Sequence, residues 1–243
     1  MKEAKIRMRS TVILVNLILC HVLILSQGAC AESKNEVFEA PAIGDAEELN
    51  RVGKYALLSP VHLVDDIDPV AGKNTIRVVV EIPTGSTQKW EVEKPSGDLK
   101  WEFRRGAPRT VQYLGYPGNY GMVPRTLLSE DNGGDGDPLD VLVLGPTVAR
   151  GSIVEVKIIG LLKMLDKGEH DDKLIAVMTD GVFAKVDTID ELDEEFPGVT
   201  AIVEIWFANY KGQGKIKIQG YDGLKKANKV LAQALDEYQE QSR

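Results

Sequence analysis

The sequence predicts an α+β protein, in which a small β-barrel of short strands is accompanied by a few helices. Alternating apolar segments recur between residues 75 and 178, each bounded by Gly, Pro or charged turns. Helical periodicity is concentrated after residue 188. Hydrophobic residues make up 43% of the chain and charged residues 27%. These proportions exclude disordered, collagen-like and coiled-coil chains.

The strands are predicted from apolar residues that recur with a period of two. Thr75–Ile82 alternates in this way and is stopped by Pro83. Gln88–Glu93 and Leu99–Arg104 flank a turn at 94–97, which predicts a hairpin. Further apolar runs predict strands over 139–144, 153–162, 173–178 and 215–219.

Three helices are predicted, over 188–195, 200–210 and 224–238. The first is short and acidic, and Pro197-Gly198 ends it. In the second, Ile202, Ile205 and Trp206 share the expected apolar face, although the β-branched content leaves a strand possible. The third carries an apolar stripe opposite Lys and Glu side chains, as expected of an amphipathic surface helix.

The first 31 residues have the layout of a signal peptide. A basic segment precedes an apolar run over 11–25, and Ala29-x-Ala31 forms a cleavage site. The run is shorter than the roughly 20 apolar residues of a membrane-spanning helix, so no stable span is expected in the mature chain. Both cysteines, Cys20 and Cys30, lie in this leader, and cleavage leaves no thiol. Lipidation of Cys30 is the alternative.

The rest of the chain divides into a polar lead-in over 32–54 and one domain over 55–243. If the leader is cleaved, we expect an exported protein that is periplasmic, secreted or in an organelle lumen, and a cytoplasmic location is disfavoured. The formal net charge of −8 argues against nucleic acid as a partner.

The most informative segment is a glycine-rich turn that leads directly into a strand. It carries Asp135, Asp137 and Asp140, whose carboxylates repel one another unless a positive charge lies between them. Oxygen ligands of this kind favour hard cations, Mg²⁺ in particular. A second acidic cluster, with Asp166 and Asp171, lies between two predicted strands and could converge on the same metal cluster. Solvated acidic turns are the simpler alternative for each cluster alone.

Side chains that could bind phosphate groups are also present. Cationic and phenolic candidates are Lys89, Arg104, Arg105, Arg109, Tyr116, Tyr120, Lys173, Tyr210 and Lys211. Each of them alone would be an ordinary surface charge or a tyrosine at the end of a barrel. Their significance depends on the acidic clusters beside them.

Several motifs, in this order, resemble the family I soluble inorganic pyrophosphatases. They are Glu81-Ile-Pro83, Lys89-x-Glu91, Tyr116-Pro-Gly-Asn-Tyr120-Gly, Gly134-Asp-Gly-Asp-Pro-Leu-Asp-Val141, Lys163-x-x-Asp166, Asp171-x-Lys173 and Tyr210-Lys211. The resemblance extends from about residue 59 to residue 238. It implies an OB-like five-stranded barrel with packed helices, and hydrolysis of pyrophosphate to two phosphates with several Mg²⁺ ions. We also expect a homo-oligomer.

The resemblance implies a role for each matching position. Asp137 resembles the general base. The positions that resemble metal ligands are Asp135, Asp140, Asp166 and Asp171. The positions that resemble substrate contacts are Lys89, Arg109, Tyr120, Lys173, Tyr210 and Lys211, and the supporting positions are Glu81, Glu91, Arg105 and Tyr116. Arg109 is preferred over Arg105 as the family arginine. Lys167 departs from the family, which often has a second acid there, and this puts the outermost metal sites in doubt.

Two other functions fit part of the pattern. A metal-dependent phosphotransferase or glycosyltransferase could use Asp135-x-Asp137, but no nucleotide-binding fingerprint accompanies it. An exported OB-like module could bind a structural cation without any hydrolysis. The basic and tyrosine positions that match substrate contacts disfavour that second alternative.

Overall fold

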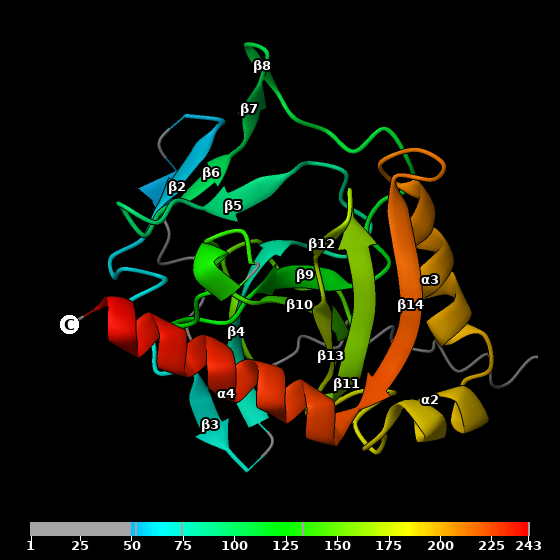
Figure 1. Cartoon of the computed structure of the whole chain (residues 1–243). Helices are drawn as coiled ribbons and strands as arrows, with labels where there is room; N and C mark the ends of the chain where they lie inside the picture. The colour runs from blue at the N-terminus through cyan, green and yellow to red at the C-terminus, as the bar shows by residue number, and fades with distance from the viewer. Residues whose placement is uncertain (1–49, 52, 74, 133, 243) are drawn as a thin grey trace, which may run out of the picture. The chain divides into compact units, whose positions relative to one another are not determined.

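The structure is a computed structural model that describes residues 50–51, 53–73, 75–132 and 134–242 (Figure 1). All of them belong to one compact unit. The predicted leader over 1–31 and most of the polar lead-in lie outside the described residues, so they stay predictions. No described helix combines the length and the apolar content that a bilayer-crossing helix requires.

The α+β class is confirmed, because the described residues form three sheets and three α-helices. The main sheet contains β3 (Val70–Gly72), β4 (Thr75–Ile82), β9 (Asn119–Met122), β10 (Asp140–Leu144), β11 (Ile153–Asp166), β12 (Glu169–His170), β13 (Lys173–Met178) and β14 (Ile216–Gly223). A smaller sheet contains β1 (Asn50–Arg51), β2 (Ala56–Leu58), β6 (Leu99–Trp101) and β5 (Trp90–Val92), and β7 (Phe103–Arg104) pairs with β8 (Ala107–Pro108). The helices are α2 (Ile189–Glu195), α3 (Val199–Asn209) and α4 (Leu224–Gln241).

Five strands of the main sheet follow one another in a circuit of pairings. β4 pairs with β9, β9 with β10, β10 with β13, β13 with β11, and β11 again with β4. Only the β10–β13 pairing is parallel within this circuit. It places the first residues of two strands side by side, and this is where the candidate site lies.

Sequence reasoning found β4 and β13 with their observed bounds but did not predict β9. The reason lies in Gly121, where a Cβ atom would stand 1.9 Å from the carbonyl oxygen of Val79 on β4. Glycine therefore permits the close pairing of β9 with β4 and at the same time removes the apolar alternation that identifies a strand. The predicted strand Leu99–Arg104 is divided, because β6 ends at Trp101 and β7 turns away with β8 into a projecting hairpin (Figure 1).

The second predicted helix is confirmed as α3, but its expected apolar face is wrong in part. Ile202 and Ile205 are 61% and 60% exposed, whereas Val203, Trp206 and Phe207 are buried. The helix carries apolar side chains on two faces, and the face with Trp206 and Phe207 is the buried one. Trp206 packs against Tyr116 with 4.4 Å between ring centroids. Burial of the aromatic rings removes more apolar area from water than burial of Ile202 and Ile205 would, so the aromatic face packs against the core.

Two hydrophobic clusters lie on the two sides of the main sheet. One joins the sheet to α2 and α3, and the other joins it to α4, which crosses the strands in Figure 1. Ala227, Leu231 and Ala234 form the buried apolar face of α4. Tyr238 on the same helix is half-buried against a third cluster, which contains Leu63 and Trp90, and its hydroxyl donates to Asp65 Oδ1 over 2.7 Å.

The C-terminal helix also holds the acidic loop. The backbone N–H of Leu127 donates to the carbonyl of Ala234 at 2.9 Å. The N–H of Ser129 donates to the buried carboxylate of Glu237 at 2.7 Å. Within the loop, the N–H of Leu128 donates to the carbonyl of Asp137 at 2.9 Å. The segment that carries the first aspartate cluster is therefore fixed to α4.

We predict that Glu237→Ala destabilises the fold, because it removes the acceptor of the Ser129 N–H in a partly buried position. The free energy of unfolding, measured by urea titration, should fall by about 1–3 kcal/mol. Glu240→Ala on the exposed side of the same helix is the matched control and should leave it unchanged. Equal effects of the two substitutions would contradict this role of Glu237.

Candidate active site

The aspartates and lysines of the candidate site lie together because β10 and β13 are parallel neighbours. Val141 pairs with Leu174, so the preceding residues, Asp140 and Lys173, begin the two strands side by side. Asp171 lies just before β13, and Asp166 ends β11 on the other side of β13. The sheet therefore brings both predicted acidic clusters to one edge.

Lys173 is the centre of this arrangement. Its side chain is 2% exposed, and its ammonium group donates to Asp140 Oδ2 over 2.6 Å and also to Asp171. Burial alone would lower the pKa of Lys173, but the two carboxylates outweigh burial and raise it. Burial would raise the pKa of Asp140, but Lys173 and Lys89 lower it overall. Lys173 and Asp140 thus stabilise each other in their charged forms.

Lys211 connects the second acidic cluster to the first. Its ammonium group lies 2.7 Å from Asp166 Oδ2 and 3.9 Å from Asp171 Oδ2. The other carboxylate oxygen of Asp166, Oδ1, is buried and has no hydrogen-bond partner among the described residues. A buried carboxylate oxygen without a partner is costly, so this position favours a cationic ligand.

Three tyrosines form a phenolic wall beside the acids. The rings of Tyr116 and Tyr120 lie 5.0 Å apart, and Tyr210 stacks on Trp206 at 4.6 Å. Burial raises the pKa of each of the three hydroxyls. They therefore stay protonated near neutral pH and can donate hydrogen bonds to an anion. Tyr120 lies near Asp140 and contributes, after Lys173 and Lys89, to lowering the pKa of that carboxyl.

Glu81, Lys89 and Glu91 line the same region from β4 and β5. The Glu81 carboxylate accepts from the N–H of Val92 at 2.7 Å, and burial raises the pKa of Glu81 to about 8. Lys89 lies 2.9 Å from Glu91 and 5.3 Å from the ring centre of Tyr120. Lys89 is thus one more lysine of the site that lies against a carboxylate, as Lys173 and Lys211 do.

Asp135 and Asp137 are exposed on the acidic loop. The N–H of Asp137 donates to Asp135 Oδ1 at 3.0 Å. The ammonium group of Lys94, a residue that sequence reasoning did not select, lies 2.6 Å from Asp137 Oδ1 and 2.7 Å from the carbonyl of Gly136. Lys94 lies in the turn after β5, where a polar lysine has no distinguishing sequence signal.

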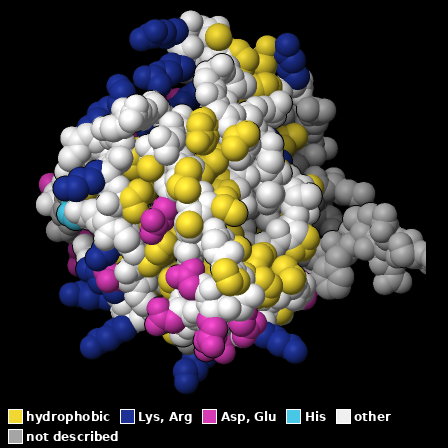
Figure 2. All heavy atoms as spheres, turned by 90° about the vertical axis from the view of Figure 1, so that its right-hand side faces the viewer, with side chains coloured by type: hydrophobic (Ala, Val, Ile, Leu, Met, Phe, Trp, Pro, Cys, Tyr) yellow, Lys and Arg dark blue, Asp and Glu magenta, His cyan; other side chains and the backbone are white. Residues whose placement is uncertain are grey.

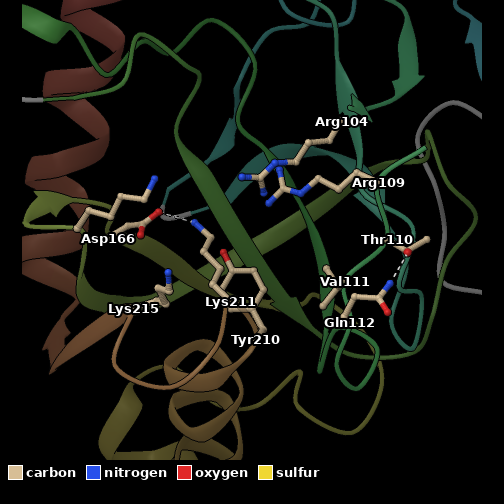
Figure 3. A pocket seen from close by; sticks show the side chains of 10 residues that line it. Arg104, Arg109, Thr110, Val111, Gln112, Asp166, Tyr210, Lys211 and Lys215 are labelled. Atoms are coloured by element: carbon tan, nitrogen blue, oxygen red, sulfur yellow. Dashed lines mark hydrogen bonds and ion pairs between the residues drawn. The ribbon is translucent and has the colours of Figure 1, made fainter. Parts of the chain in front are cut away.

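The arginines are placed around a pocket of about 540 Å³. Arg109 and Arg104 both point into it (Figure 3), and Arg109 pairs with Glu102. Asp166, Tyr210 and Lys211 line the same pocket. Arg105 does not line it, because it occupies the exposed turn of the β7–β8 hairpin with φ of 54°. The structure thus favours Arg109 over Arg105 and places Arg104, another candidate from the sequence, beside Arg109.

Arg150 is a further residue that sequence reasoning missed. Its guanidinium lies 4.5 Å from the ring centre of Trp90 and donates to the backbone carbonyl of Glu81. Burial lowers the pKa of Arg150 to about 10. It precedes β11 in a turn without any motif, so only the fold reveals that it supports the Glu81 strand.

The donor chemistry of the site fits a hard cation. Within the part of the chain that the structure describes, no three acidic or histidine side chains are arranged as a ready metal cluster. Lysine ammonium groups instead lie against the carboxylates of Asp137, Asp140, Asp166 and Asp171. The carboxylate oxygens and the unpartnered Asp166 Oδ1 are the ligand type that Mg²⁺ prefers.

Carboxylates suited to hard cations, the buried Lys173 and protonated tyrosines together have the chemistry that a phosphate-rich anion requires. The family model described as inorganic pyrophosphatase matches residues 78–239 of this chain. The chain belongs to the inorganic pyrophosphatase family.

Individual relatives agree with the family assignment. The chain is 37% identical over 179 residues to the inorganic pyrophosphatase of Bos taurus, covering 67% of this chain and 60% of that protein. It is 38% identical over 170 residues to that of Gluconobacter oxydans, covering 67% of this chain and 90% of that protein. The chain spans only 45% to 60% of the length of the first animal relatives it matches.

The fold is shared with solved structures. A truncated vacuolar soluble pyrophosphatase of Trypanosoma cruzi, determined in complex with PPi, aligns with a TM-score of 0.68 and 25% identity. The alignment covers 76% of this chain and 80% of that one.

We predict that Glu81 makes the metal-free protein less stable as the pH rises. Its folded pKa of about 8 exceeds its ordinary value of 4.5, so the folded state holds a proton that the unfolded state has released. This contribution to stability is full below pH 4.5 and is lost as the pH rises through about 8. Glu81→Gln should flatten the slope.

The measurement is urea unfolding in EDTA between pH 4.5 and 9. Glu195→Gln, on an exposed helix end, is the control and should keep the wild-type slope. A Glu81→Gln protein with an unchanged slope would show that Glu81 is charged in the folded state.

Proposed function

We propose that this chain hydrolyses inorganic pyrophosphate to two phosphates and uses several Mg²⁺ ions to do so. The observation that carries the proposal is Lys173, buried between Asp140 and Asp171 at the edge of the site. This alternation of buried cation and carboxylates suits a substrate made of anionic phosphates and divalent cations. Membership in the family supports the proposal, as does the PPi complex of the Trypanosoma cruzi protein.

One group of residues in the site would bind the metal ions, and another group would bind the substrate. Asp135, Asp140, Asp166 and Asp171 would hold Mg²⁺, which when bound neutralises phosphate charge and polarises the attacking water. Lys173, Lys211, Arg109 and Tyr210 would bind the phosphates. Positioning and charge neutralisation supply most of the acceleration in phosphoryl transfer.

Asp137 would act as the general base. It is exposed to water, and its present partner Lys94 is also exposed, so the pair is easily separated. A carboxylate that is freed in this way can accept the proton of the attacking water. A module that only binds a structural cation is not favoured, because it gives no role to the cationic pocket or the phenolic wall.

The circuit β4–β9–β10–β13–β11 would form the expected OB-like barrel, with the site at the edge where β10 and β13 begin. Its five strands and their pairings match the number expected from the resemblance.

We predict that the full chain releases phosphate from Mg-pyrophosphate and that Asp137→Asn and Asp140→Ala each lose activity by a factor of roughly 100 or more. Asp137→Asn removes the proton acceptor, and Asp140→Ala removes a cation ligand. Phosphate release in a colorimetric assay measures both. Asp236→Asn on the exposed side of α4 is the control.

The result decides between the alternatives. Full activity of Asp140→Ala would refute the cation-binding role of that aspartate. A wild-type chain that binds Mg²⁺ but releases no phosphate would favour the cation-binding module.

The exposed face of α3 suggests where a homo-oligomer would form. Ile202 and Ile205 are joined there by Leu114, which is 73% exposed and held beside α3 by a 2.9 Å hydrogen bond from Trp206 to its carbonyl. Figure 2 shows apolar side chains gathered on this side of the molecule. Such a face is well suited to association with a second copy.

We predict that Ile202→Asp combined with Ile205→Asp dissociates the oligomer, because two charges would then be buried at the interface. Sedimentation velocity should show the mass of a single chain for the double variant. Val70→Asp on β3 is the control, since Val70 is 52% exposed and lies on a different element. An unchanged oligomeric mass in the α3 variant would exclude this face.

A further inference from the structure

The side chain of Arg150 extends from the turn before β11 to the segment that carries Lys89. The turn is attached to β4, because the N–H of Gly151 donates to the carbonyl of Val80 at 2.7 Å. The next residue of β4 is Glu81, and its backbone carbonyl accepts a hydrogen bond from Arg150 Nη1. The partly buried guanidinium is therefore fixed to the end of β4 at both its base and its tip.

The same guanidinium contacts the two residues on either side of Lys89. Its Nη2 atom lies 3.4 Å from Gln88 Oε1, and its Cζ atom lies 4.5 Å from the ring centre of the buried Trp90. The indole N–H of Trp90 also donates to Gln88 Oε1 at 3.2 Å. Arg150 thus holds Gln88 and Trp90 together, through a polar contact to one and a cation–π contact to the other.

The direction of the Lys89 side chain follows from that of its two neighbours. Gln88 forms an antiparallel bridge and β5 begins at Trp90, so the chain is extended here. Successive side chains of an extended chain point to opposite faces, so Gln88 and Trp90 share the face opposite Lys89. The 2.9 Å ion pair of Lys89 with Glu91 lies on the Lys89 face. The N–H of Lys89 also donates to the carbonyl of Arg109 at 3.1 Å, which fixes the backbone.

We propose that Arg150 is a positioning residue for substrate binding, which directs the ammonium group of Lys89 toward a phosphate by holding both neighbours of that lysine. This inference rests on the proposed function, with Lys89 as a phosphate contact, as the family resemblance implies. Arg150 lies on the Trp90 side of the segment, so its effect on the substrate passes through the lysine. It lies outside the motifs that carry the family resemblance.

The first test removes the guanidinium and measures KM and kcat separately. Arg150→Met keeps an unbranched apolar side chain against Trp90 but removes the charge and the hydrogen bonds. It should raise the KM for Mg-pyrophosphate about tenfold, as expected when one charged contact is weakened, and change kcat by less than about threefold. Arg77→Met is the matched control, because Arg77 also donates to backbone carbonyls and pairs with Glu155. It should leave the KM within about twofold of the wild-type value.

Arg150→Lys is the second variant, and its retained charge over Trp90 should keep it folded even where Arg150→Met is not. Lysine supplies one donor for the Glu81 carbonyl but lacks the planar fork that also reaches Gln88. The KM should therefore rise only about threefold. An unchanged KM in both variants would overturn the positioning role.

A double-mutant cycle tests whether Arg150 acts through Lys89. Lys89→Gln alone should raise the KM by roughly tenfold or more, because it removes the ammonium group. Adding Arg150→Met to it should raise the KM further by less than about twofold, because no ammonium group is left to direct. Effects of the two substitutions that multiply in full would overturn the positioning role.

Calorimetric titration with methylenediphosphonate and Mg²⁺ measures binding without turnover, because the bridging carbon of this pyrophosphate analogue resists hydrolysis. The Kd should rise about tenfold in Arg150→Met and stay unchanged in Arg77→Met. A wild-type chain that shows this dependence but releases no phosphate from pyrophosphate would contradict the proposed function and support the positioning role. Phosphate release with a Kd and a KM that are insensitive to Arg150 would overturn the positioning role alone. A chain that neither binds the analogue nor releases phosphate would overturn both.

Discussion

The ion pairs of one buried lysine are the constraint on which the rest of the site depends. Lys173 begins β13, is almost fully enclosed, and has its charge balanced by Asp140 and Asp171. An enclosed ammonium group without these partners would be strongly destabilising, so the lysine and both aspartates must be placed together. The parallel pairing of β10 with β13 does this, and it is the one parallel pairing in a circuit that is otherwise antiparallel. The strand pairing that closes the circuit is thus also the pairing that balances the charge of Lys173.

Lysines also balance the charges of acidic residues farther from Lys173. Lys211 balances Asp166, Lys94 balances Asp137, and Lys89 balances Glu91. The ammonium group that lies against each of these three carboxylates offsets the repulsion between neighbouring acids. Cations bound during function would have to compete with these groups. The exposed pair of Lys94 and Asp137 is the easiest for a cation to separate, and the enclosed pairs of Lys173 are the hardest.

Sequence reasoning found most of what depends on local pattern. The period of two identified β4, an apolar run identified β13, which is buried throughout, and the helical stripe identified α4. It missed β9, where glycine replaces the apolar alternation, and on α3 it placed Trp206 correctly but not the two exposed isoleucines. The acidic motifs were recognisable because their spacing is unusual.

The residues that sequence reasoning missed share one property: they act through contacts between segments that are far apart in the chain. Arg150 lies in a turn that carries no motif, and it contacts Trp90 and the backbone carbonyl of Glu81. Lys94 meets Asp137 across 43 residues. No periodicity or spacing encodes such contacts, since they arise only when the sheet has closed on itself. Sequence pattern therefore found the acids and the lysines Lys89, Lys173 and Lys211, and the fold was needed to find Lys94 and Arg150.

The attachment of the acidic loop to α4 has a consequence for the order in which the protein is assembled. Ser129 and its acceptor Glu237 are separated by 108 residues. A chain that emerges from the ribosome therefore exposes its first aspartate cluster long before the helix that anchors it exists. The strands of the main sheet can pair earlier, but this loop acquires its fixed shape only when α4 docks. Competence for cation binding at the loop is accordingly among the last properties that the folding chain gains.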